Sequence, residues 1–131
     1  MRIMIDTNIL ISALLFPSKR MDDLVYRITT RYTLVLSSYI IEELLEVTER
    51  KFKDKVAVVD TLLSQIPYEL VYTPKHPALG IFEIRDKKDY PVLYSAITEG
   101  VDIFISGDKD FDEIVIEKPE ILTPAAFLED Y

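Results

Sequence analysis

The chain has 131 residues, of which 49% are hydrophobic and 29% are charged, and its net charge is −8. This length and composition predict one globular domain, residues 1–131, with a core large enough to fold without disulfides or structural metals. The acidic balance argues against a protein that only coats nucleic acid, and the absence of cysteine excludes disulfides, thiolate zinc sites and cysteine nucleophiles.

The first half of the chain predicts two strands that are each followed by two helices. Apolar residues are contiguous in the strands and recur at helical spacing in the segments between them. The expected elements are strand 3–5, helix 9–16, helix 21–30, strand 32–38, a helix from a Ser37 or Ser38 cap towards Arg50, and helix 56–66. Pro17 and Pro67 end the helices that precede them.

The second half of the chain continues this alternation. We expect strand 68–72, helix 89–99, strand 101–106, and a short strand followed by a helix over 120–130. Alternation of this kind predicts a three-layer α/β/α domain, in which helices cover both faces of a parallel sheet of four or five strands.

Membrane association and histidine-based catalysis are both disfavoured. No apolar run is long enough to span a membrane, and Met1 leads directly into a strand rather than a signal peptide. We therefore expect a cytoplasmic protein without a membrane partner. The single histidine, His76, lies in a proline-rich loop, where an exposed side chain is its simplest interpretation. Acid–base catalysis by two histidines of one chain is excluded.

Acidic residues follow the first and the fourth expected strands. Asp6 comes directly after strand 3–5, and Asp108 comes two residues after Ser106. In open parallel sheets, ligands bind beyond the carboxyl ends of the strands, and both residues are expected there. Each also has a simpler explanation, because Asp6 can cap the helix that follows it and a turn rich in Gly and Asp is a common loop.

Glu43 differs from its neighbours in its position on the predicted helix. The apolar residues of this helix form one stripe at 100° per residue: Ile40, Ile41, Leu44, Leu45 and Val47. Glu43 lies at the border of the stripe, whereas Glu42 and Glu46 lie nearly opposite it. Only Glu43 is therefore expected to reach a half-buried site.

Two further aspartates lie near the helix at 89–99. Asp89 is at the start of this helix, where the helix dipole already favours a negative charge. Asp86, in a charged loop, is expected to be an ordinary surface residue. Several carboxylates that converge without cationic partners repel one another, and a hard divalent cation such as Mg²⁺ or Mn²⁺ is the usual reason for such a cluster.

Four segments together resemble the PIN domain family, within it the toxin-like branch of VapC-type ribonucleases. They are "MIDTN", "LSSYIIEEL", "DYPVLYSA" and "ISGDKDF", and they occur in the order of the family over nearly the whole chain. Each segment is weak evidence alone, and the ordered set is strong.

The resemblance implies a metal-dependent endoribonuclease. It implies that Mg²⁺ or Mn²⁺ is held by Asp6, Glu43, Asp89 and Asp108, with Asp110 matching a further acidic position that could exchange roles with Asp108. Asn8 and Ser106 match small polar positions that orient these ligands. The family often works as a homodimer paired with a small antitoxin protein, and the implied substrate is RNA. Metal-assisted hydrolysis needs no histidine.

Two alternatives remain open at this stage. A phosphatase of the haloacid-dehalogenase kind would use Asp6 as its nucleophile, with Gly107, Asp108 and Asp112 forming a later motif; Asn8 then replaces the second aspartate of the first motif. A catalytically silent, RNA-binding PIN-like protein is the other alternative. Intact carboxylates at all four positions argue against it.

Overall fold

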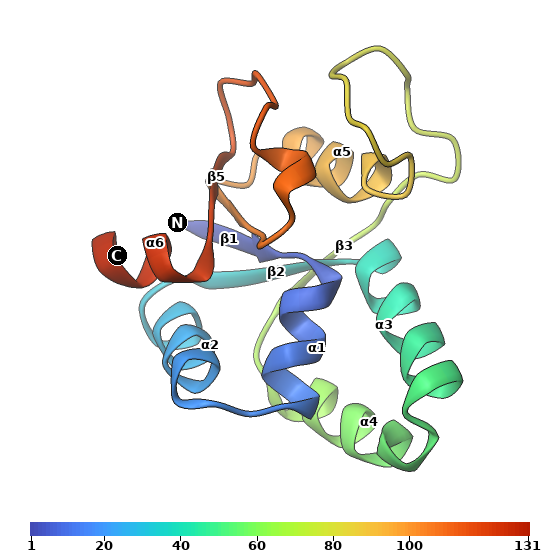
Figure 1. Ribbon diagram of the computed structural model, residues 1–131, viewed down its shortest axis with the longest axis vertical. Helices are drawn as coiled ribbons and strands as arrows, with labels where there is room; N and C mark the ends of the chain where they lie inside the picture. The colour runs from blue at the N-terminus through green and yellow to red at the C-terminus, as the bar shows by residue number, and fades with distance from the viewer.

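The sheet consists of five parallel strands in the order β3-β2-β1-β4-β5. This arrangement comes from a computed structural model that describes residues 1–131 (Figure 1). The strands are β1 (Arg2–Ile5), β2 (Thr33–Ser37), β3 (Glu69–Val71), β4 (Ile103–Ile105) and β5 (Glu120–Leu122). All four pairings between neighbouring strands are parallel, as the alternation of strands and helices predicts.

Six α-helices and two short 3₁₀ helices connect and flank the strands. The α-helices are α1 (Thr7–Leu15), α2 (Lys19–Arg31), α3 (Ser38–Lys51), α4 (Val56–Gln65), α5 (Tyr90–Thr98) and α6 (Pro124–Asp130). The 3₁₀ helices are η1 (Lys53–Lys55) and η2 (Lys109–Phe111). Every strand and α-helix expected from the sequence is present. No helix combines the length and the apolar character that a bilayer crossing needs.

Helices cover both faces of the sheet. In Figure 1, helices α1 to α4 lie on one side of the sheet and α5 lies on the other, so the predicted three-layer arrangement is confirmed. Apart from Arg2, the residues of β1 and β4 are buried between these layers; Met4 and Phe104, for example, have no exposed surface. Gly100, two residues after the end of α5, has a φ of +66°, a conformation that glycine adopts without strain.

One detail of the predicted apolar stripe on α3 is wrong. The helix buries Ile40, Leu44 and Thr48, whereas Leu45 is 38% exposed. The buried face is therefore narrower than the apolar pattern and centred on the i, i+4, i+8 row. Glu42 and Glu46 are exposed, as predicted.

The topology places the ends of β1 and β4 side by side. β1 is central, and the chain leaves it first towards β2 and later returns on its other side as β4. Ile5 is in register with Ile105, so the next residues, Asp6 and Ser106, emerge together at the carboxyl edge. The backbone N–H of Asp6 donates to the carbonyl oxygen of Ile105 at 3.1 Å. Such a reversal of strand order opens a crevice at this edge.

Candidate active site

Asp6 is held in one orientation by two hydrogen bonds. Its Oδ1 accepts from the backbone N–H of Ile9 at 2.9 Å, so it does cap α1, and its Oδ2 accepts from the hydroxyl of Ser106. Asp6 is only 7% exposed. Burial raises the pKa of its carboxyl, and the hydrogen bonds from Ser106 and Ile9 oppose that rise. Helix capping and a functional role are therefore compatible, because the cap uses one oxygen only.

Ser106 connects Asp6 to the acidic turn that follows β4. The Ser106 Oγ accepts from the backbone N–H of Asp108 at 3.0 Å, and Asp108 Oδ1 accepts from the backbone N–H of Asp110 at 2.8 Å. Phe111 anchors this turn, because its buried ring packs edge-on against Phe104 with centroids 5.1 Å apart.

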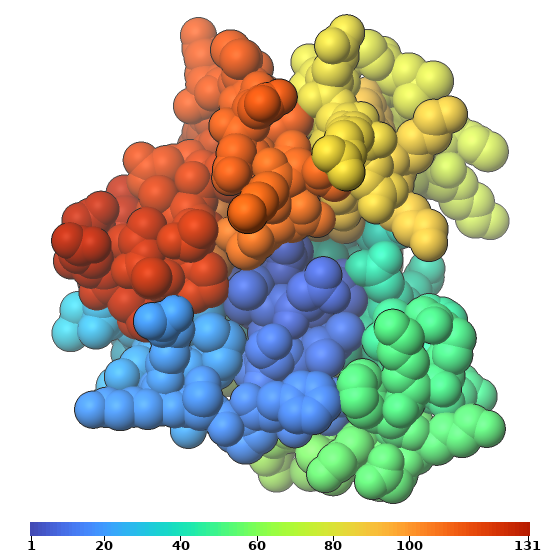
Figure 2. Space-filling view, viewed as in Figure 1, coloured from blue at the N-terminus to red at the C-terminus, as the bar shows by residue number.

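A small cavity lies between the start of α1 and the turn that follows β4. It has a volume of about 280 Å³, and its lining includes Asp6, the exposed Asn8 and Asp108. In Figure 2, the amino-terminal helix α1 (blue) lies against the segment around η2 (orange) and against α3 (green). The structure thus brings Asp6 and Asp108 together, although 101 residues separate them in the sequence.

Asp89 lies half-buried at the start of α5 and makes no side-chain hydrogen bond to the helix. Its Oδ2 is fully buried and has no hydrogen-bond partner. The pKa of the Asp89 carboxyl is raised to about 7. Burial is the largest cause, followed by the negative charge of Asp108 and then that of Asp86. A cap therefore does not explain this residue.

Asp86 comes closer to the other carboxylates than the sequence indicated. Its side chain is exposed, as expected, but single carboxylate oxygens of Asp86, Asp89 and Asp110 lie within 4.8 Å of one another. A tight turn brings it there: the backbone N–H of Asp89 donates to the Asp86 carbonyl oxygen, and the backbone N–H of Lys88 donates to its Oδ1. The spacing of three residues between Asp86 and Asp89 is the feature of the sequence that could have predicted this turn.

Glu43 is half-buried on α3 and faces the same region. Its negative charge contributes to the raised pKa of Asp6 and to that of Tyr39. The border position predicted from the helical pattern agrees with this placement. All five acidic residues singled out from the sequence are thus at the carboxyl edge, with Asp86 in addition.

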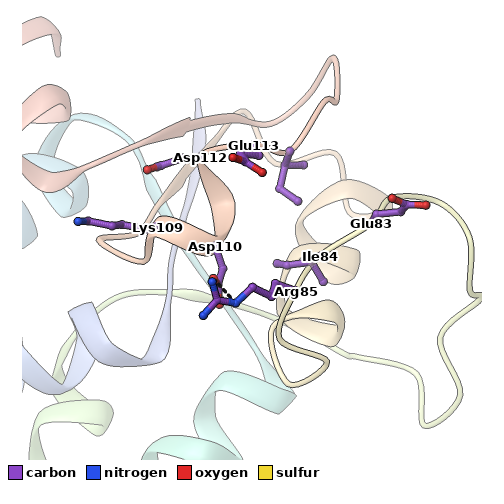
Figure 3. A pocket seen from close by; sticks show the side chains of 8 residues that line it. Glu83, Ile84, Arg85, Lys109, Asp110, Asp112 and Glu113 are labelled. Carbon is purple, nitrogen blue, oxygen red and sulfur yellow. Dashed lines mark ion pairs between the residues drawn. The ribbon is translucent and has the colours of Figure 1, made fainter.

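Arg85 is the one cation that pairs with this group. Its guanidinium lies 3.8 Å from Asp110 Oδ1, and its side chain is 90% exposed. Both residues line an open cavity of about 610 Å³ with Lys109 and Glu83 (Figure 3). In Figure 3 the side chains of Arg85 and Asp110 point towards each other, whereas Lys109 points away. An exposed pair at this distance contributes little and leaves most of the negative charge uncompensated.

The carboxylates fit a hard divalent cation. Carboxylate oxygens are the ligands that Mg²⁺ and Mn²⁺ prefer, and the buried Oδ2 of Asp89 lacks any other partner. A cation would also offset the repulsion that raises the pKa of Asp89. Asp86, Asp89 and Asp110 form the tightest group, and Asp6, Asp108 and Glu43 adjoin it.

The sequence model of the PIN domain matches residues 2–110. The chain belongs to the PIN domain family. PIN domains are nucleases, and therefore hydrolases, so the acidic edge is where their chemistry is expected. The haloacid-dehalogenase alternative does not agree with this family and is set aside.

The fold of this PIN domain is similar to that of a solved toxin–antitoxin structure. It matches a chain of the crystal structure of VapBC2 from Rickettsia felis bound to a DNA fragment from their promoter. The TM-score is 0.72 at 20% sequence identity, and the match covers 93% of this chain and 97% of that chain. Among curated proteins, no significant sequence match is found.

Proposed function

We propose that this PIN domain is a metal-dependent endoribonuclease. The observation that supports the proposal best is the buried, unpartnered Oδ2 of Asp89 among neighbouring carboxylates. An uncompensated group of this kind is unfavourable in a site without a ligand. It is explained if the site is built to hold a cation and, through it, a phosphate.

The proposed ligands are Asp6, Glu43, Asp89 and Asp108, with Asp110 beside them. A bound Mg²⁺ or Mn²⁺ would lower the pKa of water and offset the charge that develops on the scissile phosphate. Ser106 orients two of these proposed ligands. The Ser106 hydroxyl donates to Asp6, and its oxygen accepts from the backbone N–H of Asp108. These two proposed ligands are therefore held in a fixed position relative to each other.

A second candidate function is RNA binding without cleavage. The exposed cations Arg85, Lys88 and Lys109 lie around the site and could attract RNA by themselves. The mutually repelling carboxylates favour the nuclease, because binding alone would be stronger without them.

A small antitoxin partner and a homodimer are part of the proposal. Support comes from the similarity in fold to the VapBC2 structure and from exposed apolar side chains, among them Phe16 just after α1, Leu45 on α3 and Val58 on α4. Light scattering of the purified chain tests the dimer, since a monomer at micromolar concentration contradicts it. A cytoplasmic location fits an enzyme that acts on RNA.

The test of the nuclease is cleavage of a labelled RNA with Mg²⁺ or Mn²⁺ and with excess EDTA. We expect cleavage only with the metal, and products with a 5′-phosphate, because water rather than the 2′-hydroxyl attacks the phosphorus. Undiminished cleavage in EDTA, or a 2′,3′-cyclic phosphate, contradicts the mechanism. RNA binding without cleavage under any metal supports the second candidate.

A further inference from the structure

A third cavity at the carboxyl edge has an aromatic lining. It has a volume of about 410 Å³ and lies between the start of α3, the segment that follows β3, and the start of α5. The lining includes Tyr39 and Tyr72 and the prolines Pro74, Pro77 and Pro91. Flat aromatic and proline surfaces of this kind suit a planar ligand.

The cavity borders the acidic cluster. The Tyr39 hydroxyl donates to the carbonyl oxygen of Lys88 at 3.2 Å, and Lys88 directly precedes Asp89. Pro91, which also lines the cavity, lies two residues after Asp89 in the chain. Burial raises the pKa of the Tyr39 phenol, and the negative charges of Glu43 and Asp89 raise it further. An RNA chain bound at the cluster can therefore extend into the cavity.

The segment that carries Tyr72 is fixed on both sides. The backbone N–H of Thr73 donates to Ser38 Oγ at 2.9 Å, and the Thr73 hydroxyl shares a hydrogen bond of 2.7 Å with Ser95 Oγ. These contacts tie the segment to α3 and α5. The Tyr72 side chain nevertheless stays 74% exposed. The backbone that carries the ring is thus held in place, and the exposed ring is accessible for stacking on a ligand.

The 610 Å³ cavity and the aromatic cavity differ in charge. Besides Arg85 and Lys109, the lining of the 610 Å³ cavity contains four acidic residues: Glu83, Asp110, Asp112 and Glu113. The lining of the aromatic cavity contains one charge of each sign, Glu42 and Lys75. RNA phosphates are therefore repelled less on the aromatic side.

We propose that the aromatic cavity is the subsite for one unpaired nucleobase of the substrate, stacked on Tyr72 next to the scissile phosphate. This inference rests on the proposed function, since it assigns the part of the RNA that lies beside the cleaved bond. Stacking tolerates any base and requires an unstacked one, so the subsite selects single-stranded RNA over duplex RNA. Lys75 is placed to contact a neighbouring phosphate.

The test measures binding of a fluorescein-labelled single-stranded RNA octamer of mixed sequence, with Ca²⁺ in place of the catalytic metal. We expect Tyr72→Ala to weaken binding by about tenfold or more, the effect of losing one base–aromatic stack. Tyr72→Phe keeps the ring and should bind like the wild type. Tyr26→Ala is the matched control, because Tyr26 is 70% exposed but lies on α2.

Two further measurements distinguish the loss of base stacking from a general loss of RNA binding. Lys75→Gln should reduce the slope of log binding constant against log salt by about 0.7, the value for one phosphate contact of a single strand. Single-turnover cleavage by Tyr72→Ala at subsaturating enzyme with Mn²⁺ should fall by about the same tenfold as binding, whereas Tyr72→Phe should cleave like the wild type.

The outcomes distinguish this inference from the nuclease itself. If the wild type binds and cleaves RNA and Tyr72→Ala binds equally well, the base subsite is wrong and the nuclease stands. Equal losses in Tyr72→Phe and Tyr72→Ala also overturn it, because the hydroxyl rather than the ring then matters. If the wild type neither binds nor cleaves RNA, the proposed function fails and the subsite fails with it.

Discussion

The two ends of the sheet treat acidic residues in opposite ways. At the amino end, Asp102 accepts a backbone N–H from Arg2 at 2.8 Å and lies 3.0 Å from the ammonium of Lys118. The hydrogen bond from Arg2 and the contacts with Lys118 lower the pKa of Asp102. At the carboxyl end, the pKa values of Asp6 and Asp89 are raised.

This contrast separates structural charge from charge kept for a ligand. The Arg2 guanidinium also donates through Nε to Glu69 at 2.8 Å, so both carboxylates at the amino end have protein partners. At the carboxyl end, the one nearby ion pair is the exposed contact of Arg85 with Asp110. A fold that can neutralise its acidic residues at one edge leaves them uncompensated at the other, as a cation site requires.

The largest expected effect is on cleavage at the carboxyl end. Glu43→Gln should lower the rate by about 100-fold or more, because even residues that only support metal ligands cost 10–100-fold. Glu49→Gln, an exposed neighbour on α3, is the matched control and should be close to neutral. RNA cleavage rates with Mn²⁺ test the pair. If the Glu43→Gln enzyme cleaves RNA like the wild type, Glu43 is not part of the catalytic site.

The next largest effect is on stabilisation by metal. Metal that binds only the folded state should stabilise the wild type by about 2.7 kcal/mol at roughly 100 times its dissociation constant. Asp89→Asn and Asp6→Asn should lose most of this gain, and Asp102→Asn at the other end should keep it. Thermal unfolding with Mn²⁺ and with EDTA measures the difference. Equal stabilisation of all four proteins would falsify the metal site.

The fold could be predicted from the sequence because every element carries a local signal. Apolar strands, helical spacing and prolines or caps at the boundaries are all short-range, and their alternation decides the parallel arrangement. The ends of β1 and β4 were predicted to share an edge, which placed Asp6 near Asp108. Leu45 was assigned to the buried face of α3 because the apolar pattern does not show how much of the helix surface the neighbouring elements cover.

The candidate site could be predicted only in part, because side-chain partners are long-range. The helix dipole alone was enough to explain Asp89, yet its Oδ2 is buried without a hydrogen-bond partner. Asp86 looked like surface, and only the folded turn brings it near Asp110. The pairing of Ser106 with Asp6 crosses 100 residues of chain. The aromatic cavity depends on Thr73 joining two helices, which no local pattern indicates.

A smaller effect is expected on the stability of the metal-free protein. The folded pKa of Asp89, about 7, is above its unfolded value, so the folded state binds the proton more tightly. Its contribution is therefore most favourable at low pH and is lost as the pH rises from about 4 to about 7. Asp89→Asn cannot ionise, so it should be more stable than the wild type at pH 8, by roughly 1–2 kcal/mol after allowance for solvent screening.

Urea unfolding in EDTA at pH 8 and at pH 5 measures this difference. We expect the advantage of Asp89→Asn to shrink at pH 5, where the wild-type carboxyl is already protonated. The absence of a side-chain cap removes the main effect that could mask it. A variant that is less stable than the wild type at pH 8 would mean that the charge of Asp89 is compensated within the protein.

The smallest effect is expected at the amino end, and its sign is opposite. The folded pKa of Asp102 is lowered, so its contribution is present above the unfolded value of 3.8 and is lost as the pH falls through the folded pKa. Asp102→Asn keeps an oxygen for the Arg2 N–H and loses the pairing with Lys118, so it should be less stable at pH 7 by about 0.5–1 kcal/mol. The same urea series, extended below about pH 3, should show this deficit shrinking as the pH falls through the folded pKa and the wild-type carboxyl is protonated. Opposite signs for Asp89→Asn and Asp102→Asn at neutral pH would establish that the two edges differ in charge compensation rather than in burial alone; equal signs would remove the distinction on which the cation site rests.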